Sequence, residues 1–328
     1  MPPTVVVTDH EFADLAPERA VIESAGFTLV DAQASSAEEV IRACAEADAV
    51  INQYQQLDAK VISGLDRCRI ISRYGIGLNT IDVAAATAAG IAVANVPDGS
   101  LDDVSDHTIA LMLALSRGVA AYDRSIRAGE WSYRAAGPLF RLRGSTLGLV
   151  GFGQIPRRVA AKAAPFGLRV VAYDPFASEQ DARDLGVELV TLDDLYSRSD
   201  VISVHVPLTQ ETRGLIDAQA FARMRPTALL VNTSRGPVVD EPALIAALER
   251  RGIAGAGLDV FGVEPLDVDS PLRRSDRVVL SPHAAWYSED SEVEIRTKTA
   301  QNVVLALQGA PVPYQVNTPA AVPPRDPR

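Results

Sequence analysis

The feature that most constrains the fold of this chain is a glycine turn between two apolar runs near its middle. Residues 147–150 form a short apolar run, Gly151 and Gly153 follow it, and a second run at 168–173 ends at Asp174. Strand, glycine turn, helix, strand and acid in this order are typical of a dinucleotide-binding βαβ unit. Gly151 permits the tight turn, and Gly153 lets the backbone approach a pyrophosphate at the helix N-terminus. Asp174 stands where a carboxylate accepts hydrogen bonds from the adenosine ribose.

The third glycine of this fingerprint is replaced by Pro156. Proline is tolerated in the first turn of a helix, where the backbone N–H has no intrahelical partner and the fixed φ is already helical. We therefore expect an intact turn, a slightly displaced helix and one fewer amide donor near the pyrophosphate. The alternative interpretation is a purely structural turn in another kind of α/β protein.

Bulk composition excludes several classes of protein. A net charge of −11 argues against nonspecific nucleic-acid binding. No apolar run approaches the ~20 residues that span a bilayer, and the N-terminus has no signal-peptide pattern, so we expect no membrane association. Cys44 and Cys68 form no metal or redox motif, which favours buried, reduced thiols and a cytoplasmic location. The four histidines show no metal-ligand spacing, so we expect no metal.

Strand-like and helical segments alternate along the chain, which predicts parallel sheets covered by helices. About 100 residues of this pattern precede the glycine turn. We predict an α/β protein with two doubly wound parallel-sheet domains. A Rossmann NAD-binding domain at 101–285 would be inserted into a flavodoxin-like substrate domain of 1–100 plus 286–328, to which a final helix at 288–308 returns. The expected strands lie at 5–8, 28–30, 49–52, 70–73, 91–95, 147–150, 168–173, 187–190, 201–204, 228–232, 255–259 and 278–281, with helices at 16–25, 37–47 and 81–89.

Four strands that follow the glycine turn end in residues capable of chemistry. These residues are His205, Arg235, Glu264 and His283. Strand carboxyl ends are where ligands bind in open α/β sheets, so we expect the four to lie near the cofactor. His205 could contact the cofactor, although a histidine at a buried strand end is more often structural.

Three of these side chains match the needs of 2-keto acid reduction. A guanidinium such as that of Arg235 binds a carboxylate through paired hydrogen bonds. The imidazole of His283 titrates near neutrality and can protonate the nascent alkoxide. A neighbouring carboxylate such as Glu264 orients the imidazole and favours its charged form. Taken singly, each residue has a structural explanation, but their joint occurrence at successive strand ends favours catalysis.

With these residues in place, the chain resembles the D-isomer-specific 2-hydroxyacid dehydrogenase family over residues 4–317. The motifs that carry the resemblance are Arg73-Tyr74-Gly75-Ile76-Gly77 with Asn79 and Asp82, the glycine turn, the run from Asn232 to Glu241, Leu258-Asp259-Val260-Phe261 with Glu264-Pro265, and Ser281-Pro282-His283. The resemblance implies that Arg235, Glu264 and His283 are the catalytic set. It also implies an NAD site lined by Gly151, Gly153, Gln154, Ile155, Asp174, His205, Thr233, Ser234, Arg235, Asp259 and His283.

The same resemblance implies how substrate is bound and how the chain assembles. The backbone of Tyr74, Gly75, Ile76 and Gly77 would bind the substrate carboxylate together with Arg235 and His283. The family resemblance also implies a homodimer, with the helix from about Asp102 and an arm at about 130–143 in the interface. Residues 282–289 and 141–144 look most like the C-terminal-binding-protein branch, where a tryptophan lines the substrate pocket, so Trp286 is a candidate specificity residue. An interface or core role for Trp286 remains an equal alternative.

The leading hypothesis is an NAD-dependent D-2-hydroxyacid dehydrogenase acting on a small 2-keto or 2-hydroxy acid. Alternatives are a phosphoglycerate dehydrogenase-like activity and an NAD(H)-sensing, corepressor-like interaction module. Formate oxidation on the same scaffold is disfavoured, because that chemistry typically pairs the histidine with a glutamine, whereas this chain has Glu264. Asp174 would repel a 2′-phosphate, so we expect NAD rather than NADP. The substrate side chain stays open, although the loops at 52–56 and 98–103 contain no cation suited to a phosphate.

Overall fold

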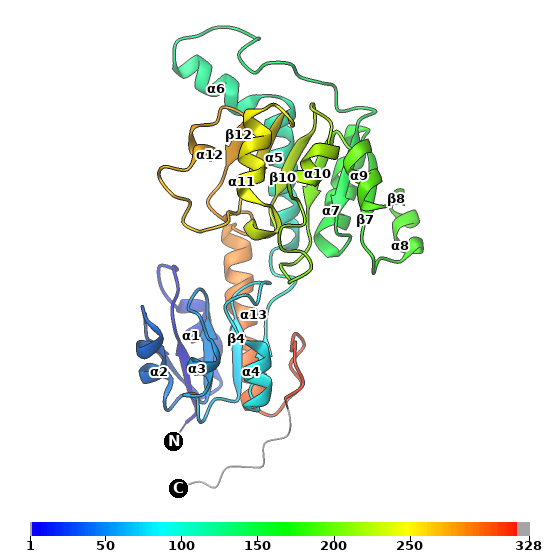
Figure 1. Cartoon of the computed structure of the whole chain (residues 1–328). Helices are drawn as coiled ribbons and strands as arrows, with labels where there is room; N and C mark the ends of the chain where they lie inside the picture. The colour runs from blue at the N-terminus through cyan, green and yellow to red at the C-terminus, as the bar shows by residue number, and fades with distance from the viewer. Residues whose placement is uncertain (1, 320–328) are drawn as a thin grey trace. The chain divides into compact units, whose positions relative to one another are not determined.

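The computed structural model describes residues 2–319, and the chain divides into two compact units (Figure 1). The first unit comprises Met1–Ser100 and Ser288–Arg328, and the second comprises Leu101–Tyr287. Residues 320–328, which end the expected substrate domain, lie outside the described residues. The second unit is therefore inserted into the sequence of the first, and each is described here separately.

The first unit is built on a five-stranded parallel sheet of order β2-β1-β3-β4-β5, the flavodoxin-like order. Its inner strands are buried apolar runs, as parallel sheets covered on both faces require. Helices α1 and α13 pack together on one face, and α2, α3 and α4 form the apolar core of the other. The strands are β1 (Thr4–Val7), β2 (Thr28–Asp31), β3 (Ala49–Asn52), β4 (Ile70–Arg73) and β5 (Ala92–Ala94); the helices are α1 (Ala16–Ser24), α2 (Ala37–Cys44), α3 (Ala59–Ile62), α4 (Val83–Ala88) and α13 (Glu289–Leu307).

A buried charged network joins α1, α13 and the end of β4. The guanidinium of Arg296 donates to both carboxylate oxygens of Glu18, each bond 2.9 Å long. The hydroxyl of Tyr74 donates to the same carboxylate at 2.9 Å. Glu18 is fully buried and Arg296 is only 4% exposed, so neither charge has access to bulk water. Such a pair is tolerated in the interior only while both partners are present.

The second unit contains a seven-stranded parallel sheet of order β12-β11-β10-β9-β6-β7-β8, which is the Rossmann order with one added strand. Both sheets are wholly parallel, which confirms the predicted fold class. The strands are β6 (Thr146–Val150), β7 (Arg169–Tyr173), β8 (Val187–Leu189), β9 (Val201–Val204), β10 (Leu229–Asn232), β11 (Gly255–Leu258) and β12 (Val278–Leu280).

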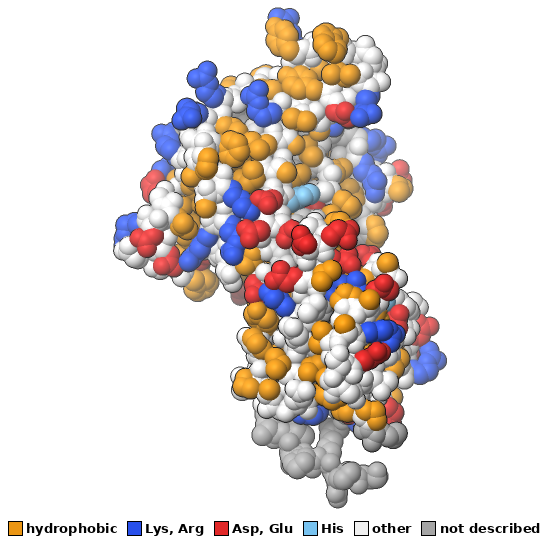
Figure 2. Space-filling model, turned by 180° about the vertical axis from the view of Figure 1, so that it is seen from behind, with side chains coloured by type: hydrophobic (Ala, Val, Ile, Leu, Met, Phe, Trp, Pro, Cys, Tyr) orange, Lys and Arg blue, Asp and Glu red, His pale blue; other side chains and the backbone are white. Residues whose placement is uncertain are grey.

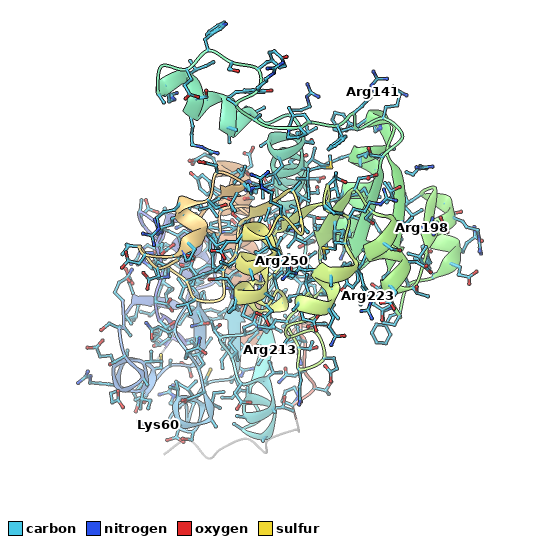
Figure 3. All side chains as sticks on the ribbon, turned by 45° about the horizontal axis from the view of Figure 1, so that its top comes forward. Lys60, Arg141, Arg198, Arg213, Arg223 and Arg250 are labelled. Carbon is cyan, nitrogen blue, oxygen red and sulfur yellow. The ribbon has the colours of Figure 1, made fainter. Side chains whose placement is uncertain are left out.

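Helices cover both faces of this second sheet. On one face α5 and α7 pack with Leu147 and Leu149 of β6, and on the other α9, α10 and α11 pack with Val150. Side chains of alternate residues in β6 thus enter different cores, as strand geometry dictates. Arg198, Arg223 and Arg250 point outward from α9, α10 and the end of α11 (Figure 3). The helices are α5 (Leu101–Ser116), α6 (Val119–Arg127), α7 (Gln154–Ala163), α8 (Glu179–Asp184), α9 (Leu192–Arg198), α10 (Ala218–Arg223), α11 (Glu241–Glu249) and α12 (Pro271–Arg274).

Two further features concern the expected environment of the protein. Among residues 2–319, no helix combines the length and the apolar character needed to cross a lipid bilayer. Cys44 and Cys68 are buried free thiols of the first unit. Burial raises the pKa of Cys44 to about 12 and raises that of Cys68 as well, so both thiols resist ionisation.

We predict that Glu18→Ala destabilises the first unit by about 3 kcal/mol, because it leaves the Arg296 guanidinium buried without its main counter-charge. The measurement is the free energy of unfolding from urea titration, followed by circular dichroism. Glu23→Ala on the same helix is the matched control, since Glu23 forms an exposed ion pair with Arg19 and should change stability little. Equal losses in the two variants would contradict the importance of the buried network.

Candidate active site

The glycine turn lies where β6 leads into α7, next to the end of β9. Gly151 has φ +100°, and a Cβ on this residue would stand 3.1 Å from the carbonyl carbon and oxygen of His205. Both its conformation and its surroundings therefore favour glycine. β6 and β9 are adjacent although β7 and β8 separate them in sequence, so the turn occupies the switch point of the sheet. Ligands bind at such points in doubly wound sheets.

The N-terminus of α7 can receive an anion. Gly153 is the N-cap residue and provides no side chain to cap the helix, and a Cβ there would meet no atom within 4 Å. The amides of Gln154 and Ile155 belong to the first turn, where N–H groups lack intrahelical acceptors. Pro156 is the third residue of this helix, within the first turn as predicted. The open space and the helix N-terminus together suit a pyrophosphate.

Asp174 follows β7 and faces the turn. One of its carboxylate oxygens accepts from the amide of Phe152 at 2.8 Å, and the other accepts from the amide of Phe176 at 2.9 Å. A carboxylate has about four acceptor sites. Asp174 can therefore stabilise the turn and still accept hydrogen bonds from ribose hydroxyls. The residues of this region fit a nicotinamide dinucleotide.

His205 and Thr233 lie at the ends of β9 and β10. The His205 ring nitrogen Nε2 is 2.8 Å from the hydroxyl of Ser203, and desolvation of the ring lowers its pKa to about 3. His205 is thus neutral near pH 7 and is not suited to act as a general acid. The hydroxyl of Thr233 lies 2.9 Å from that of Thr108 on α5. These contacts fix both strand ends beside the glycine turn.

A turn organised by Asn232 presents Arg235. The Asn232 side chain, which is fully buried, donates to the carbonyl of Arg235 at 3.0 Å and accepts from the amide and hydroxyl of Ser234. Gly236 then packs against the next loop, since a Cβ on it would come within 1.8 Å of the Phe261 carbonyl oxygen. This close contact fixes the Arg235 turn against the loop that leads to Glu264.

Glu264 and His283 form a direct pair. His283 Nδ1 is 2.7 Å from one carboxylate oxygen of Glu264, while the other oxygen accepts from the amide of Phe261 at 2.9 Å. Partial burial opposes ionisation of Glu264. The hydrogen bond and charge of His283, the Phe261 amide and the charge of Arg235 outweigh it, so the pKa of Glu264 is lowered. Burial lowers the pKa of Arg235 as well, while the charge of Glu264 acts in the opposite direction. All three predicted catalytic side chains therefore occupy one edge of the second unit.

Asp259 supports the backbone around His283. It is 1% exposed, and its carboxylate accepts from the amides of Ala284 and Ala285, each at 2.9 Å. Its carbonyl accepts from the amide of His283 at 2.7 Å. His283 has φ +55°, which is uncommon for a residue with a side chain and requires support from its surroundings. We predicted Asp259 as a cofactor residue, a role that remains a prediction; its visible contacts are with the histidine loop.

The remaining predicted residues lie at other places in the two units. Trp286 is half-buried near the end of the second unit, with its ring edge-on to that of Tyr287. Tyr74, Gly75, Ile76 and Gly77 follow β4 in the first unit. The Tyr74 hydroxyl donates to Glu18 and its amide donates to the carbonyl of Asn52, so neither group is available as a donor to a ligand.

Sequence patterns did not indicate which residues hold these loops, namely Asn232, Ser281 and His107 of the second unit and Asp9 of the first. Asn232 and Ser281 belong to the motifs that carry the family resemblance. Their closeness in sequence to Arg235 and His283 was the one signal that could have indicated their roles. His107 and Asp9 gave no such signal, because their partners are more than 40 residues away in sequence.

Comparison with known proteins agrees with this geometry. Residues 109–285 match the family model of the NAD-binding domain of D-isomer-specific 2-hydroxyacid dehydrogenases. The chain is 41% identical over 285 residues to D-3-phosphoglycerate dehydrogenase of Mycobacterium leprae, covering 87% of this chain and 54% of that one. It is 41% identical over 283 residues to glyoxylate reductase of Korarchaeum cryptofilum, covering 85% of each.

A solved structure resembles the whole chain. The holo form of Rhodotorula graminis D-mandelate dehydrogenase superposes with a TM-score of 0.88 at 29% identity, covering 98% of this chain and 99% of that one. The chain spans about half the length of the phosphoglycerate dehydrogenases it matches, but most of the length of the glyoxylate reductase.

Proposed function

The chain belongs to the D-isomer-specific 2-hydroxyacid dehydrogenase family, and from this premise we propose that it uses NAD(H) to interconvert a small 2-keto acid and its D-2-hydroxy acid. The observation that carries the proposal is the 2.7 Å pair of Glu264 and His283 in the same unit as the glycine turn. When bound, NADH supplies the hydride that reduces the keto carbon.

The side chains of the second unit have separate tasks in this reaction. Arg235 binds the substrate carboxylate through paired hydrogen bonds and polarises the neighbouring carbonyl. Glu264 holds His283 through Nδ1, which leaves Nε2 without a partner among the described residues. Nε2 donates a proton to the oxygen of the forming alcohol, and in the oxidative direction it accepts that proton. The negative charge of Glu264 stabilises the imidazolium from which the proton leaves.

We propose the backbone of Tyr74–Gly77 in the first unit as a second carboxylate-binding element. Gly75 has φ +85°, and the carbonyls of Gly75 and Ile76 are engaged by the amide of Val96 and the side chain of Asn95. The amides of residues 75–77 have no partner among the described residues, so they are available to donate to a carboxylate. Arg73 adds positive charge beside Gly75.

A small, unphosphorylated substrate fits the neighbouring loop best. Residues 52–56 contain no lysine or arginine. The carboxylate of Asp9 accepts from the amides of Gln53, Tyr54 and Gln55, so a negative charge lies beneath the loop. A phosphate would require added cations at such a place.

We expect the purified protein to oxidise NADH with glyoxylate or pyruvate, and His283→Ala to lower kcat by about 10²–10⁴-fold, the usual contribution of a general acid. Glu264→Gln should cause a smaller loss, because it keeps a hydrogen-bond acceptor but removes the charge. The measurement is the decrease in nicotinamide absorbance under steady-state conditions.

The same assay ranks the substrates. Phosphohydroxypyruvate should have a lower kcat/KM than glyoxylate or pyruvate. Absence of turnover with every 2-keto acid, or full activity of His283→Ala, would reject the proposed reaction. A clear preference for phosphohydroxypyruvate would replace the substrate assignment but leave the reaction class standing.

We also expect a preference for NADH over NADPH of about tenfold or more in kcat/KM, equivalent to ~1.4 kcal/mol, because Asp174 repels a 2′-phosphate. Asp174→Asn keeps an acceptor and removes the charge, so it should narrow this preference. Asp184→Asn is the control, since Asp184 bonds to Gln180 on α8. Wild-type preference for NADPH would contradict the role given to Asp174.

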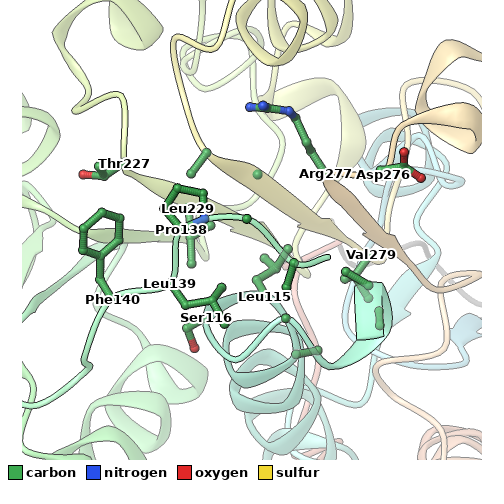
Figure 4. Close-up of a pocket in the computed structure, with 18 of the residues that line it drawn as sticks. Leu115, Ser116, Pro138, Leu139, Phe140, Thr227, Leu229, Asp276, Arg277 and Val279 are labelled. Carbon is green, nitrogen blue, oxygen red and sulfur yellow. The ribbon is translucent and has the colours of Figure 1, made fainter. Parts of the chain in front are cut away.

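We further propose a homodimer formed through α6 and the arm, defined as residues 130–143. Trp131 is 90% exposed, Tyr133 is 76% exposed and Phe140 is 58% exposed, which is unusual for large apolar side chains. Figure 2 shows hydrophobic side chains gathered where α6 and the arm lie in Figure 1. A cavity of about 1130 Å³ lies between the arm and the sheet, lined by Leu115, Leu139, Leu229 and Val279 among others (Figure 4). Apolar side chains of a second copy would fill this cavity.

Sedimentation equilibrium should therefore give about twice the chain mass of 34.9 kDa. Trp131→Ser combined with Phe140→Ser should shift the protein toward monomer, because it removes apolar area from the proposed interface. Phe176→Ser is the control, since Phe176 is 95% exposed on a different loop. A monomeric wild-type protein, or a doubly substituted protein that stays dimeric, would reject this interface.

A further inference from the structure

A hydrogen-bonded chain runs from α5 to the catalytic histidine loop. His107 Nε2 lies 2.8 Å from the hydroxyl oxygen of Ser281. The Ser281 hydroxyl lies 2.6 Å from one carboxylate oxygen of Asp259 and donates to it. The same oxygen accepts from the amide of Ala284, and the second oxygen accepts from the amide of Ala285. His107 is thereby connected, through two side chains, to both residues that follow His283.

The hydrogen positions in this chain follow from valence. An ionised carboxylate only accepts hydrogen bonds, so the single Ser281 proton points to Asp259. Ser281 can then only accept from His107, which places a proton on Nε2 of that imidazole. The chain therefore has one direction, from His107 through Ser281 to Asp259. A side chain without a donor at position 107 would leave the Ser281 hydroxyl with one partner fewer.

The histidine loop needs this support. His283 adopts φ +55°, a left-handed conformation that is unfavourable for a residue with a side chain and persists only where the surroundings fix it. Asp259 fixes it through three bonds, from the amides of His283, Ala284 and Ala285. The Ser281 hydroxyl is a third donor to the Asp259 carboxylate, beside the amides of Ala284 and Ala285. A small rotation of that carboxylate would move the His283 backbone and, with it, the imidazole.

We propose that His107 is a positioning residue for His283, acting through Ser281 and Asp259. The proposal rests on the proposed function, since it assigns a purpose to the geometry of the proton-donating histidine. On the same helix, Ile109, Leu111 and Met112 pack in the apolar core, whereas the hydroxyl of Thr108 lies 2.9 Å from that of Thr233 after β10. The His107 side chain is 27% exposed, so its position does not require an apolar residue.

Kinetics of four variants test the proposal. His107→Phe keeps a ring without the donor and should lower kcat about tenfold, because misplacing a reacting group reduces the rate. Its KM for NADH should change little, since the substitution removes no contact with the glycine turn. His107→Gln keeps an N–H at the position of Nε2 and should restore most of kcat. Ser281→Ala should resemble His107→Phe, and the double variant should lose no more than either single one, because both interrupt one chain.

Ser199→Ala is the control, as another buried serine of this unit, whose hydroxyl donates to the carbonyl of Leu195; its kcat should match that of the wild type. Thermal unfolding of every variant distinguishes misplacement of the His283 side chain from loss of the folded structure. Wild-type kcat in His107→Phe would overturn the proposal. The proposal would also be overturned if kcat of His107→Gln did not exceed that of His107→Phe. The same holds if the two losses of kcat multiplied in the double variant.

Nuclear magnetic resonance of the histidine rings tests the chain without turnover. His107 should show the Nε2–H form, and Ser281→Ala should shift its Nε2 and Hε2 resonances while leaving those of His10 unchanged. An Nδ1–H form, or a His107 signal insensitive to Ser281→Ala, would overturn the chain itself. If the protein reduced no 2-keto acid, the resonances would still show whether His107 donates to Ser281. Failure of the proposed function can therefore be distinguished from failure of the hydrogen-bonded chain.

Discussion

Both sheets of this protein are wholly parallel, and the positions of the candidate site residues at the strand ends depend on that constraint. Parallel strands end at one edge, so residues as far apart in sequence as Gly151 and His283 can meet in one unit. The order of the second sheet brings β6 beside β9, which leaves the glycine turn next to His205. Chemistry is therefore confined to the loops at the carboxyl edge, while the rest of each sheet forms core.

Polar side chains at strand ends hold several loops at this edge, in addition to buried apolar residues such as Phe152 and Phe261. The carboxylate of Asp9 accepts hydrogen bonds from the amides of residues 53–55. In the same way, Asp174 accepts hydrogen bonds from the amides of Phe152 and Phe176. Asp259 accepts hydrogen bonds from the amides of Ala284 and Ala285. Asn232 performs the same task for the Arg235 turn. Hydrogen bonds to charged acceptors are stronger than hydrogen bonds to neutral ones, so each carboxylate helps to fix its loop. Precision at this edge comes from buried polar contacts.

Sequence patterns predicted the helices and strands more fully than they predicted these polar contacts. The predicted boundaries of the strands at 49–52, 70–73 and 201–204 agree with the structure, because each strand is a buried apolar run between turn signals. The helix from Ala37 ends at Cys44 rather than near 47, since no sequence signal marked its last turn. The roles of Asn232, Ser281 and His107 could not be predicted, because they depend on which distant loops become neighbours. Residue type and strand position sufficed for Glu264 and His283, whose pairing needs only adjacent strands.

Asp174 shows how one side chain can join stability to selectivity. Its carboxylate holds the amide of Phe152 inside the glycine turn, and in the proposed function it also receives the ribose. Removing it would admit a 2′-phosphate but would also release the turn that positions the helix N-terminus for the pyrophosphate. Pro156 makes this coupling tighter, because α7 has one amide fewer in its first turn and relies more on the geometry of Gly153 and Gln154. A change of cofactor preference in this chain therefore requires a replacement for Asp174 that keeps an acceptor for Phe152, as asparagine does, or a second substitution that restores one.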